Sequence, residues 1–286
     1  LGTNVLRSIV MTEIAERSFF GVHKIETRED GRFRILNHGT TVHGAMRILK
    51  EDGTPDTGRP QPLTYYHPDG PINAALIATP GAETGRRLGV VGLGTGAHAC
   101  NGAAKDSWTF FEIDPLVIRI AKNPEHFRFL SECAPEARIV TGDARLSLVK
   151  ERDSLFDNLL IDAFSSDSIP VHLMTREALE LYLAKLAPKG ILTMHISNRH
   201  MELAGVVGAL AREAGLAALT LHYPGGSGGT GYGASTPSTV VALARQGETL
   251  APLAEKGWKP IPVGDIRPWN DDFSDIISAI WRHYRP

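Results

Sequence analysis

Residues 90–100 read VVGLGTGAHAC, in which two apolar residues precede three glycines at alternate positions, Gly92, Gly94 and Gly96. A strand that runs into a glycine-rich turn and then a helix lets a ligand approach backbone N–H groups at the positive end of that helix. The G-x-G-x-G spacing lacks the third glycine of a dinucleotide fingerprint. Alone it predicts either a ligand loop or a purely structural tight turn. Thr95 is its only side chain with a hydrogen-bonding group.

Acidic residues follow the next two predicted strands. Glu112 ends WTFFE, 16 residues beyond Gly96, where a carboxylate can accept from both ribose hydroxyls. Asp143 follows ARIVTG, where a carboxylate can accept from the amine of adenine. Together the strand ends predict an adenosine-like ligand across the carboxyl edge of the sheet. The structural alternatives are a solvated strand end for Glu112 and a helix N-cap for Asp143.

A third acid, Asp162, ends the strand FDNLLI and precedes a Ser-rich loop that holds Ser165 and Asp167. A carboxylate at this edge faces the reactive end of a ligand whose adenosine is already placed. It can bind an amine or take the proton of an amine, because only the neutral amine is a nucleophile. The structural alternative is that Asp162 caps the loop.

The apolar pattern around these motifs predicts an α/β fold in which strands alternate with helices, as in a parallel, doubly wound sheet. A glycine-rich segment at 223–238 is predicted to be a flap between the last two strands. The strands are expected at 87–91, 108–113, 137–141, 157–162, 190–196, 217–222 and 238–244, and the helices near 97–104, 115–121, 124–133, 143–150, 174–187, 200–214 and 274–283.

The N-terminal part has a different rhythm. FFGVHKIETRED and RFRILNHGTT alternate in polarity on either side of Gly31, which predicts a β-hairpin. A polar loop is expected at 51–62. We therefore expect a small N-terminal β-hairpin domain with its linker over residues 1–75, and a ligand-binding domain over 76–286.

Charge, cysteine and histidine content indicate which partners, cell compartment and metals are expected. With 30 basic and 32 acidic residues, the chain shows no electrostatic footprint for nucleic acid or an anionic membrane. Cys100 and Cys133 fit no metal spacing and no disulfide framework, which favours a reducing cytoplasm. His195 and His200, like His38 and His43, lack a ligand spacing, so no metal is expected.

Further features concern the cell compartment and other enzyme classes. No apolar run approaches the ~20 residues that span a bilayer. The sequence starts at Leu1 rather than at a methionine, so the question of an upstream membrane or targeting segment is left open. Ser165 and Ser166 lack the context of a nucleophile elbow, which speaks against a hydrolase triad.

These motifs resemble a known family. The N-terminal hairpin, VVGLGTG, FFEIDP, TGDA and a fourth strand ending in Asp162 look like the spermidine synthase family of aminopropyltransferases. HGTTVHG, PLTYYHPDGP, DAFSSDSIPVHL and PWNDDFS resemble more closely the bacterial spermidine-synthase-like proteins that are often fused to a membrane transporter domain. The resemblance extends from about residue 17 to residue 280.

The resemblance implies a methyltransferase-like Rossmann domain, with a mostly parallel sheet, behind a small N-terminal β domain. The ligand would be S-adenosylmethionine or its decarboxylated form, acting as co-substrate without a metal. In the family, an amine attacks the carbon next to the sulfonium and methylthioadenosine leaves, a step of polyamine biosynthesis that depends on positioning and deprotonation. The implied cofactor-binding residues are Gly92, Gly94, Thr95, Gly96, Glu112 and Asp143; the implied catalytic residues are Asp162, Tyr66 and Asp167; and His43, His67 and Ser165 would border the substrate.

The sequence also departs from the family's pattern. Thr95 stands where an aspartate typically faces the amine end of the decarboxylated ligand, so the repulsion of the intact ligand's carboxylate is removed. The second acid after Asp162 is expected three residues on, where Ser165 stands, and Asp167 comes five residues on. Thr236 replaces a tyrosine of the late loop. These changes favour intact S-adenosylmethionine and weaken the case for putrescine as acceptor.

The leading hypothesis is an enzyme that cleaves the amino-acid-side C–S bond of the ligand. It would transfer an aminopropyl or 3-amino-3-carboxypropyl group to an amine, or act as a lyase or cyclase. The alternatives are an S-adenosylmethionine-dependent methyltransferase and a non-catalytic, ligand-sensing domain of a transporter. A small-molecule amine, or nothing beyond the sulfonium, is the expected partner. We expect a homodimer that is cytoplasmic or is the cytoplasmic part of a membrane protein.

Overall fold

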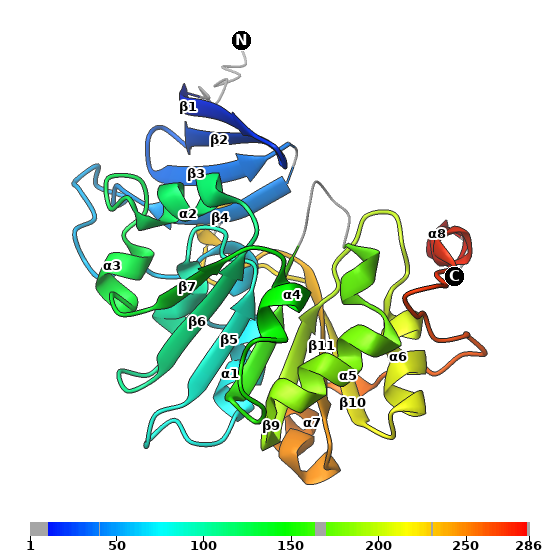
Figure 1. Cartoon of the computed structure of the whole chain (residues 1–286). Helices are drawn as coiled ribbons and strands as arrows, with labels where there is room; N and C mark the ends of the chain where they lie inside the picture. Colours follow the sequence, from blue (N-terminus) through cyan, green and yellow to red (C-terminus); the bar gives the residue numbers. More distant parts are fainter. Residues whose placement is uncertain (1–10, 40, 164–169, 230, 285–286) are drawn as a thin grey trace.

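The chain forms two β-sheets, with the smaller one lying over one edge of the larger one (Figure 1). A computed structural model describes residues 11–39, 41–163, 170–229 and 231–284. The order of elements confirms the predicted α/β class with an N-terminal antiparallel sheet. Within the described residues, no helix combines the length and the apolarity needed to cross a bilayer.

The N-terminal sheet has four antiparallel strands in the order β1 (Met11–Ser18), β2 (Gly21–Arg28), β3 (Phe33–His38) and β4 (Thr41–Arg47). The predicted hairpin is its centre, because Arg28 pairs with Phe33 across the turn. Gly31 has a φ of 87°, a conformation that glycine adopts without strain. The strands β1 and β4 were not expected and flank this hairpin. The 51–62 segment contains no strand or helix, as predicted.

The large sheet has eight strands in the order β12-β10-β11-β9-β8-β5-β6-β7. The five strands from β9 to β7 are parallel, as the sequence predicts. The prediction of a mostly parallel sheet is thus confirmed, and the antiparallel part is the other end, where β11, β10 and β12 run antiparallel to their neighbours. The strands are β5 (Arg87–Val91), β6 (Ser107–Glu112), β7 (Arg138–Thr141), β8 (Phe156–Ile161), β9 (Leu186–His195), β10 (Ala217–Tyr223), β11 (Ser238–Ala244) and β12 (Lys259–Pro260).

Most helices begin near their predicted positions, but several are shorter. The helix expected from residue 124 begins only at Phe129, because Asn123 forms a turn first. Its side-chain oxygen accepts from the Glu125 N–H, and its carbonyl accepts from the N–H groups of His126 and Phe127. The α-helices are α1 (Pro71–Ala78), α2 (Pro115–Lys122), α3 (Phe129–Cys133), α4 (Ala144–Leu148), α5 (Arg176–Lys185), α6 (Ala204–Glu213), α7 (Ala251–Glu255) and α8 (Ile276–Tyr284). The 3-10 helices are η1 (Thr64–Tyr66), η2 (Ala97–Asn101), η3 (Val171–Leu173), η4 (Gly231–Gly233) and η5 (Gly247–Leu250).

Successive residues of the central strands serve two separate cores. Val90 and Phe110 belong to the core on one face of the large sheet, and Val91 and Phe111 belong to the core on the other face. This alternation follows from the two-residue period of a strand. Helices α1 and α7 contact each other on one face, while α4, α5 and α6 cover the other (Figure 1). The predicted domain boundary at residue 75 falls inside α1 and stays a prediction.

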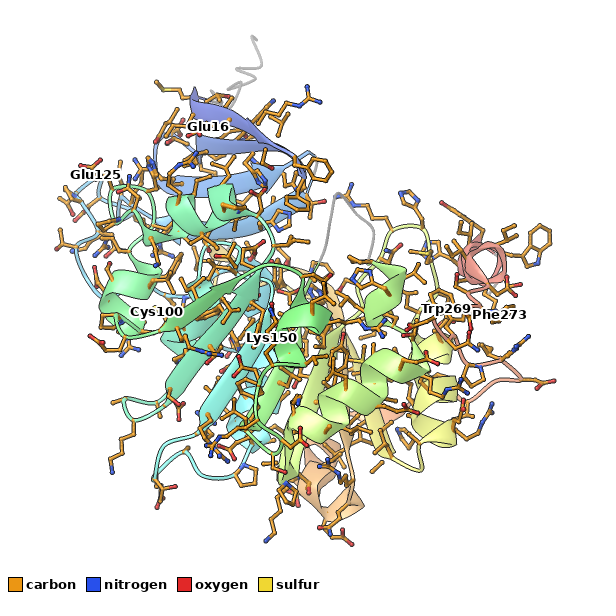
Figure 2. The ribbon with its side chains drawn as sticks, viewed as in Figure 1. Glu16, Cys100, Glu125, Lys150, Trp269 and Phe273 are labelled. Atoms are coloured by element: carbon orange, nitrogen blue, oxygen red, sulfur yellow. A yellow bond between two sulfur atoms is a disulfide. The ribbon has the colours of Figure 1, made fainter. Side chains whose placement is uncertain are left out.

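Polar contacts fasten the N-terminal sheet to the large sheet. Asp114, the N-cap of α2, accepts hydrogen bonds from Ser18 at 2.5 Å and from His23 at 2.8 Å. Burial by itself would raise the pKa of Asp114. The hydrogen bonds from Ser18, the Leu116 N–H and His23 outweigh burial and lower this pKa. Glu16 of β1 accepts from Arg119 of α2 at the surface (Figure 2). The carboxyl edge of the large sheet is therefore covered by the strands β1 to β4.

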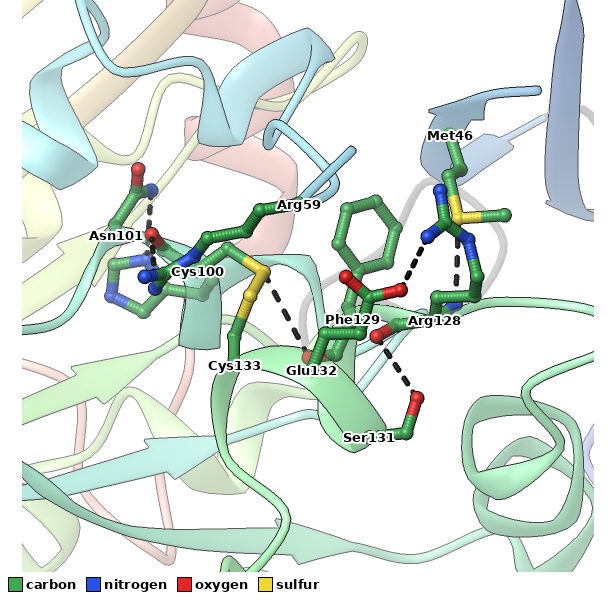
Figure 3. Close-up of a disulfide and its surroundings, with 10 residues drawn as sticks. Met46, Arg59, Cys100, Asn101, Arg128, Phe129, Ser131, Glu132 and Cys133 are labelled. Atoms are coloured by element: carbon green, nitrogen blue, oxygen red, sulfur yellow. Dashed lines mark hydrogen bonds and ion pairs between the residues drawn. A yellow bond between two sulfur atoms is a disulfide. The ribbon is translucent and has the colours of Figure 1, made fainter. Parts of the chain in front are cut away.

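The two cysteines form a disulfide, which corrects the expectation that they fit no disulfide framework (Figure 3). Cys100 lies in η2, directly after the glycine loop, and Cys133 ends α3. Their Cα atoms are 4.9 Å apart although 33 positions separate them in the sequence. The sequence could not predict this pair, because only the turn at residues 123–128 brings α3 back onto η2. The disulfide ties the helix after the glycine loop to its neighbour.

Candidate functional site

The glycine loop after β5 approaches two other segments so closely that side chains would not fit. Gly92 has a φ of 97°, and a Cβ there would clash with the carbonyl oxygen of Asp162. Gly94 has a φ of 54°, and a Cβ there would lie 2.7 Å from the carbonyl oxygen of His43. Glycine is required at both positions on steric grounds. The loop therefore joins β8 on one side to β4 of the N-terminal sheet on the other.

Thr95 lies beneath β4 and has no exposed surface. Its hydroxyl has no hydrogen-bond partner among the described residues and lies against Gly44. Thr95 lines neither of the two cavities described below. Gly96 also lies away from them and packs on Leu130 of α3. The prediction that these two residues touch the ligand is therefore left without geometric support.

Glu112 ends β6 with both carboxylate oxygens turned to the backbone. One oxygen accepts from the Leu93 N–H at 2.9 Å, and the other accepts from the Asp114 N–H at 2.9 Å. Burial raises the pKa of Glu112 in spite of these donors. The carboxylate thus holds the glycine loop in place while it also lines the cavity above the loop.

Asp143 is the N-cap of α4, which is the structural alternative given in the sequence analysis. Its side chain caps α4 by accepting from the Leu146 N–H at 3.0 Å. The second oxygen lies 3.1 Å from Nε2 of His172, which faces it from η3. Asp143 also lines the cavity, so the capping role and contact with a ligand are compatible.

The first cavity, here the glycine-loop cavity, lies between the carboxyl edge of the large sheet and the N-terminal sheet. Its described lining includes four carboxylates and four histidines but no lysine or arginine. Such a lining favours a cationic ligand over the pyrophosphate of a dinucleotide. The charged or titratable lining residues are Glu112, Asp114, Asp143, Asp162, His23, His38, His43 and His172.

Asp162 follows β8, and a side chain is hydrogen-bonded to each of its two carboxylate oxygens. The Tyr66 hydroxyl donates to Oδ2, and Nδ1 of His195 lies 2.7 Å from Oδ1. Burial, and then the charge of Asp162, raise the pKa of Tyr66 well above its usual value of 10. Tyr66 is therefore a neutral donor that orients the carboxylate. The two predicted catalytic residues Asp162 and Tyr66 are in direct contact.

A second cavity, here the β11 cavity, adjoins the first. Its lining brings together β4, η1, the ends of β9 and β10, and the start of β11. Among the described residues, only His43 and Asp162 line both cavities. The described lining residues are Thr41, Val42, His43, Tyr65, Asp162, His195, Ser197, Asn198, Arg199, His222, Thr236, Pro237, Ser238 and Thr239. His43, predicted from the sequence to border the substrate, thus lies where the two spaces meet.

Sequence reasoning missed three residues of this site. Tyr65, and not Tyr66, lines the β11 cavity, and its ring centroid is 4.9 Å from that of His195. Nε2 of His195 lies 2.7 Å from Oγ of Ser197. A signal was available, because His195 ends β9 next to β8, just as Asp162 follows β8. The sequence argument considered acids at strand ends and weighed His195 only as a metal ligand, a role that it rejected.

Other predicted residues lie elsewhere. His67 is buried against Gly228 of the late glycine-rich segment and lines neither cavity. Ser165 and Asp167 lie outside the described residues. The described part of the chain contains no group of three His, Cys, Asp or Glu side chains arranged to hold a metal ion.

His98 supports the site from behind. Its ring stacks on Tyr66 with centroids 5.2 Å apart and meets Trp108 edge-on. Burial is the main cause that lowers the pKa of His98 to about 4, although the charge of Asp162 opposes the shift. A neutral imidazole at this position packs against the tyrosine that holds Asp162.

Comparisons with known proteins agree with this architecture. No family model matches the chain. A polyamine aminopropyltransferase of Vibrio vulnificus is 33% identical over 124 residues, which are 42% of this chain and 39% of that protein. The chain therefore matches about two fifths of the length of this curated relative.

Solved structures of spermidine synthases have a similar fold. A probable spermidine synthase from Corynebacterium glutamicum superposes with a TM-score of 0.60 at 16% identity, covering 81% of this chain and 79% of that one. Spermidine synthase from Thermotoga maritima gives 0.54 at 15% identity, covering 94% and 84%. A spermidine synthase in complex with the transition state analogue AdoDATO gives 0.50 at 15% identity, covering 94% and 83%.

The fold defines the class: an α/β protein with a mostly parallel sheet, as in the solved spermidine synthases, whose carboxyl edge is covered by an N-terminal antiparallel sheet. Within this class, the chain is spermidine synthase-like in its fold and in the matched stretch of its sequence.

Proposed function

We propose that the chain is an aminopropyltransferase-like enzyme acting on S-adenosylmethionine or its decarboxylated form. It cleaves the C–S bond on the amino-acid side of the sulfonium and releases methylthioadenosine. The observation that carries this proposal is the position of Asp162 and His43 at the junction of two cavities. A group that passes between two bound molecules needs such a junction.

The glycine-loop cavity supports a sulfonium as the donor. Its four carboxylates, without lysine or arginine among the described lining residues, suit a positively charged sulfur. In this proposal, Glu112 binds the ribose hydroxyls and Asp143 binds the adenine amine, since both carboxylates line this cavity. The curated relative is a polyamine aminopropyltransferase, which supports transfer of a group from such a donor.

The β11 cavity supports the acceptor side. An amine in this cavity, beside Asp162, can attack the carbon next to sulfur, so that the new N–C bond forms as the C–S bond breaks. The electron pair of the broken bond stays on the sulfur of methylthioadenosine. Attack needs the neutral amine, and Asp162 can stabilise the positive charge that passes from sulfur to nitrogen.

The products of a defined incubation test this function. The protein is incubated separately with the intact and the decarboxylated sulfonium, each with and without putrescine, and the nucleoside and side-chain products are identified. Methylthioadenosine is expected, and the side-chain product separates aminopropyl transfer, aminocarboxypropyl transfer and lyase or cyclase chemistry. S-adenosylhomocysteine would instead identify a methyltransferase. Fast turnover of only the decarboxylated form with putrescine would contradict the interpretation of Thr95.

An isosteric variant tests the central carboxylate. Asp162→Asn is expected to lower release of methylthioadenosine by about 10²- to 10⁴-fold, the usual range for a lost acid–base or charge-stabilising group. Asp272→Asn is the matched control, because Asp272 is exposed and lines neither cavity. Ligand binding without turnover, unchanged by Asp162→Asn, would identify a sensor domain.

Assembly and cellular context are further proposals. We infer a homodimer and a small-molecule amine as partner, and the upstream transporter domain suggested by the family resemblance is part of the same proposal. Sedimentation of the protein measures the first. Co-purification from cells that express the full-length gene measures the last.

A further inference from the structure

Three side chains form a continuous hydrogen-bonded chain from the buried centre of the site into the β11 cavity. Oδ1 of Asp162 lies 2.7 Å from Nδ1 of His195, and Nε2 of His195 lies 2.7 Å from Oγ of Ser197. All three residues line that cavity. The strand ends of β8 and β9, which are parallel neighbours, place the first two side by side.

The surrounding donors assign the direction of these hydrogen bonds. The Asp162 carboxylate can only accept, so Nδ1 of His195 is the donor of that pair and Nε2 is left to accept from the hydroxyl of Ser197, whose Oγ also accepts from the backbone N–H of Thr239 at 2.8 Å. A neutral His195 then carries its proton on Nδ1 and donates it to Asp162. The imidazole thus presents its basic nitrogen toward the cavity.

Asp162 is occupied on both oxygens. Tyr66 donates to one oxygen and His195 lies at the other. A carboxylate held in this way fixes the tautomer of its histidine and stabilises the imidazolium that forms when the histidine takes a proton, as in acyl-transfer enzymes. Asp162, His195 and Ser197 have this carboxylate–histidine–hydroxyl order, although the sequence around Ser165 and Ser166 lacks the context of a nucleophile elbow.

We propose that His195 is the proton acceptor for the attacking amine, with Ser197 as the relay into the cavity and Asp162 as the positioning carboxylate. This inference rests on the proposed function and changes its mechanism, because Asp162 itself does not take the proton. The ammonium acceptor gives one proton to Ser197 Oγ while the hydroxyl hydrogen of Ser197 passes to His195 Nε2. The neutral amine then attacks the carbon next to sulfur, and the imidazolium later returns its proton to water through the cavity.

Other titratable groups share this environment and must be separated from His195. Asp162 belongs to the hydrogen-bonded chain itself, and Tyr66 donates to the other oxygen of Asp162. Burial, and then the charge of Asp162, raise the pKa of Tyr65 well above its usual value, so Tyr65 stays neutral across the range of interest. The remaining titratable or charged groups of the same cavity are His43 of β4, His222 of β10 and Arg199.

The decisive variant is His195→Asn, whose amide keeps a donor for Asp162 but cannot accept a proton. We measure kcat, KM and their pH profiles with the sulfonium and amine pair that gives the most methylthioadenosine in the assay above. We expect kcat to fall about 100-fold or more, KM for the sulfonium to stay within about threefold, and imidazole in the buffer to restore part of the rate. We expect the natural protein to lose rate at low pH, and we expect this loss to disappear in the variant.

Further variants make the result specific. Ser197→Ala is expected to lower kcat by about tenfold, since water can replace a hydroxyl relay. His43→Asn and His222→Asn are expected to keep the loss of rate at low pH. His126→Asn is the matched control for a histidine remote from both cavities.

Each outcome is decisive. A His195→Asn protein with kcat within threefold of the natural protein overturns the relay and leaves the proposed function intact. A lower kcat without a changed pH profile and without imidazole rescue also overturns it, because His195 would then act only through packing. If the natural protein releases no methylthioadenosine from either sulfonium, the proposed function falls, and the assignment of His195 falls with it.

Discussion

Thr95 shows how a residue can be singular in the sequence and hidden in the structure. It was the polar exception in a loop of glycines, and it lies buried beneath Gly44 with its hydroxyl unpaired among the described residues. A sequence pattern reports which residue types are present in a loop, but it does not report which side of the loop is covered by another segment. The strand β4 covers this side.

Thr95→Val is therefore expected to stabilise the free protein. A buried hydroxyl without a partner is unfavourable, and replacing it with a methyl group of similar size should add about 1 to 2 kcal/mol to the free energy of unfolding. Chemical denaturation measures this change, and calorimetric titration with methylthioadenosine should show unchanged affinity. Weaker binding would show that the hydroxyl reaches the ligand, as the sequence had suggested.

His98 makes stability depend on pH. Its folded pKa of about 4 lies below the unfolded value of 6.5, so the unfolded chain binds the extra proton between these values. The stability that comes from keeping His98 neutral is fully present above pH 6.5, and it is lost as the pH falls toward 4 because the unfolded chain becomes protonated first. The difference corresponds to roughly 3 kcal/mol.

The matched variant for this effect is His98→Phe, which keeps the ring contacts with Tyr66 and Trp108 and does not titrate. Urea unfolding at pH 7 and at pH 4.5 should show a smaller loss of stability in the variant than in the natural protein. Equal losses would place the pH dependence in other groups.

At the scale of elements, the sequence predicted the parts that follow a simple period. The strand β5 matches its expected range, and the turn at Gly31 lies where the hairpin was predicted. Sequence reasoning did not find β4, although β4 supplies His43. This strand has a glycine at its middle, and its place is determined by pairing with β3 rather than by its own pattern.

The direction of the strands at the antiparallel end of the large sheet could not be predicted from the sequence for a similar reason. The segments at β10 and β11 were found as strands, but strand direction depends on the connection between them. The connection at 224–237 contains no helix longer than the three residues of η4 in its described part. A crossover between parallel strands usually needs a longer helical connection, which agrees with the antiparallel pairing observed.

The disulfide between η2 and α3 is expected to matter for stability. Closing a loop between positions 33 apart restricts the unfolded chain, and the chain-entropy model predicts a contribution of about 3 to 4 kcal/mol. The Cys100→Ala, Cys133→Ala double variant should therefore melt at a lower temperature than the natural protein.

Reductant provides the control for this prediction. Dithiothreitol should lower the melting temperature of the natural protein toward that of the double variant and leave the double variant unchanged. A natural protein that is insensitive to reductant, with its thiols demonstrably reduced, would contradict a stabilising role for the bond.

At the scale of the whole molecule, the site belongs to both sheets. The glycine-loop cavity is lined by His23, His38 and His43 from the N-terminal sheet and by the strand ends of the large sheet. The sequence predicted the acids on the large sheet, because each follows an apolar run. It could not place the histidines of the hairpin opposite them, since the relation between the two sheets depends on long-range contacts such as that between His23 and Asp114.

Ligand binding is accordingly expected to protect both sheets together. Methylthioadenosine at 100 times its dissociation constant should stabilise the native state by roughly 2.7 kcal/mol. Hydrogen exchange followed by mass spectrometry should slow in β2 to β4 as well as in the glycine loop. Protection confined to the large sheet would contradict a cavity shared by the two.

The carboxylate lining of the glycine-loop cavity has a consequence for turnover. Under the proposed reaction, the sulfonium enters with a positive charge and methylthioadenosine leaves as a neutral thioether. The acids that attract the substrate lose their electrostatic hold on the product at the moment the C–S bond breaks. The chemistry itself would thus promote product release, and the cavity would discriminate against its own spent ligand without any moving part.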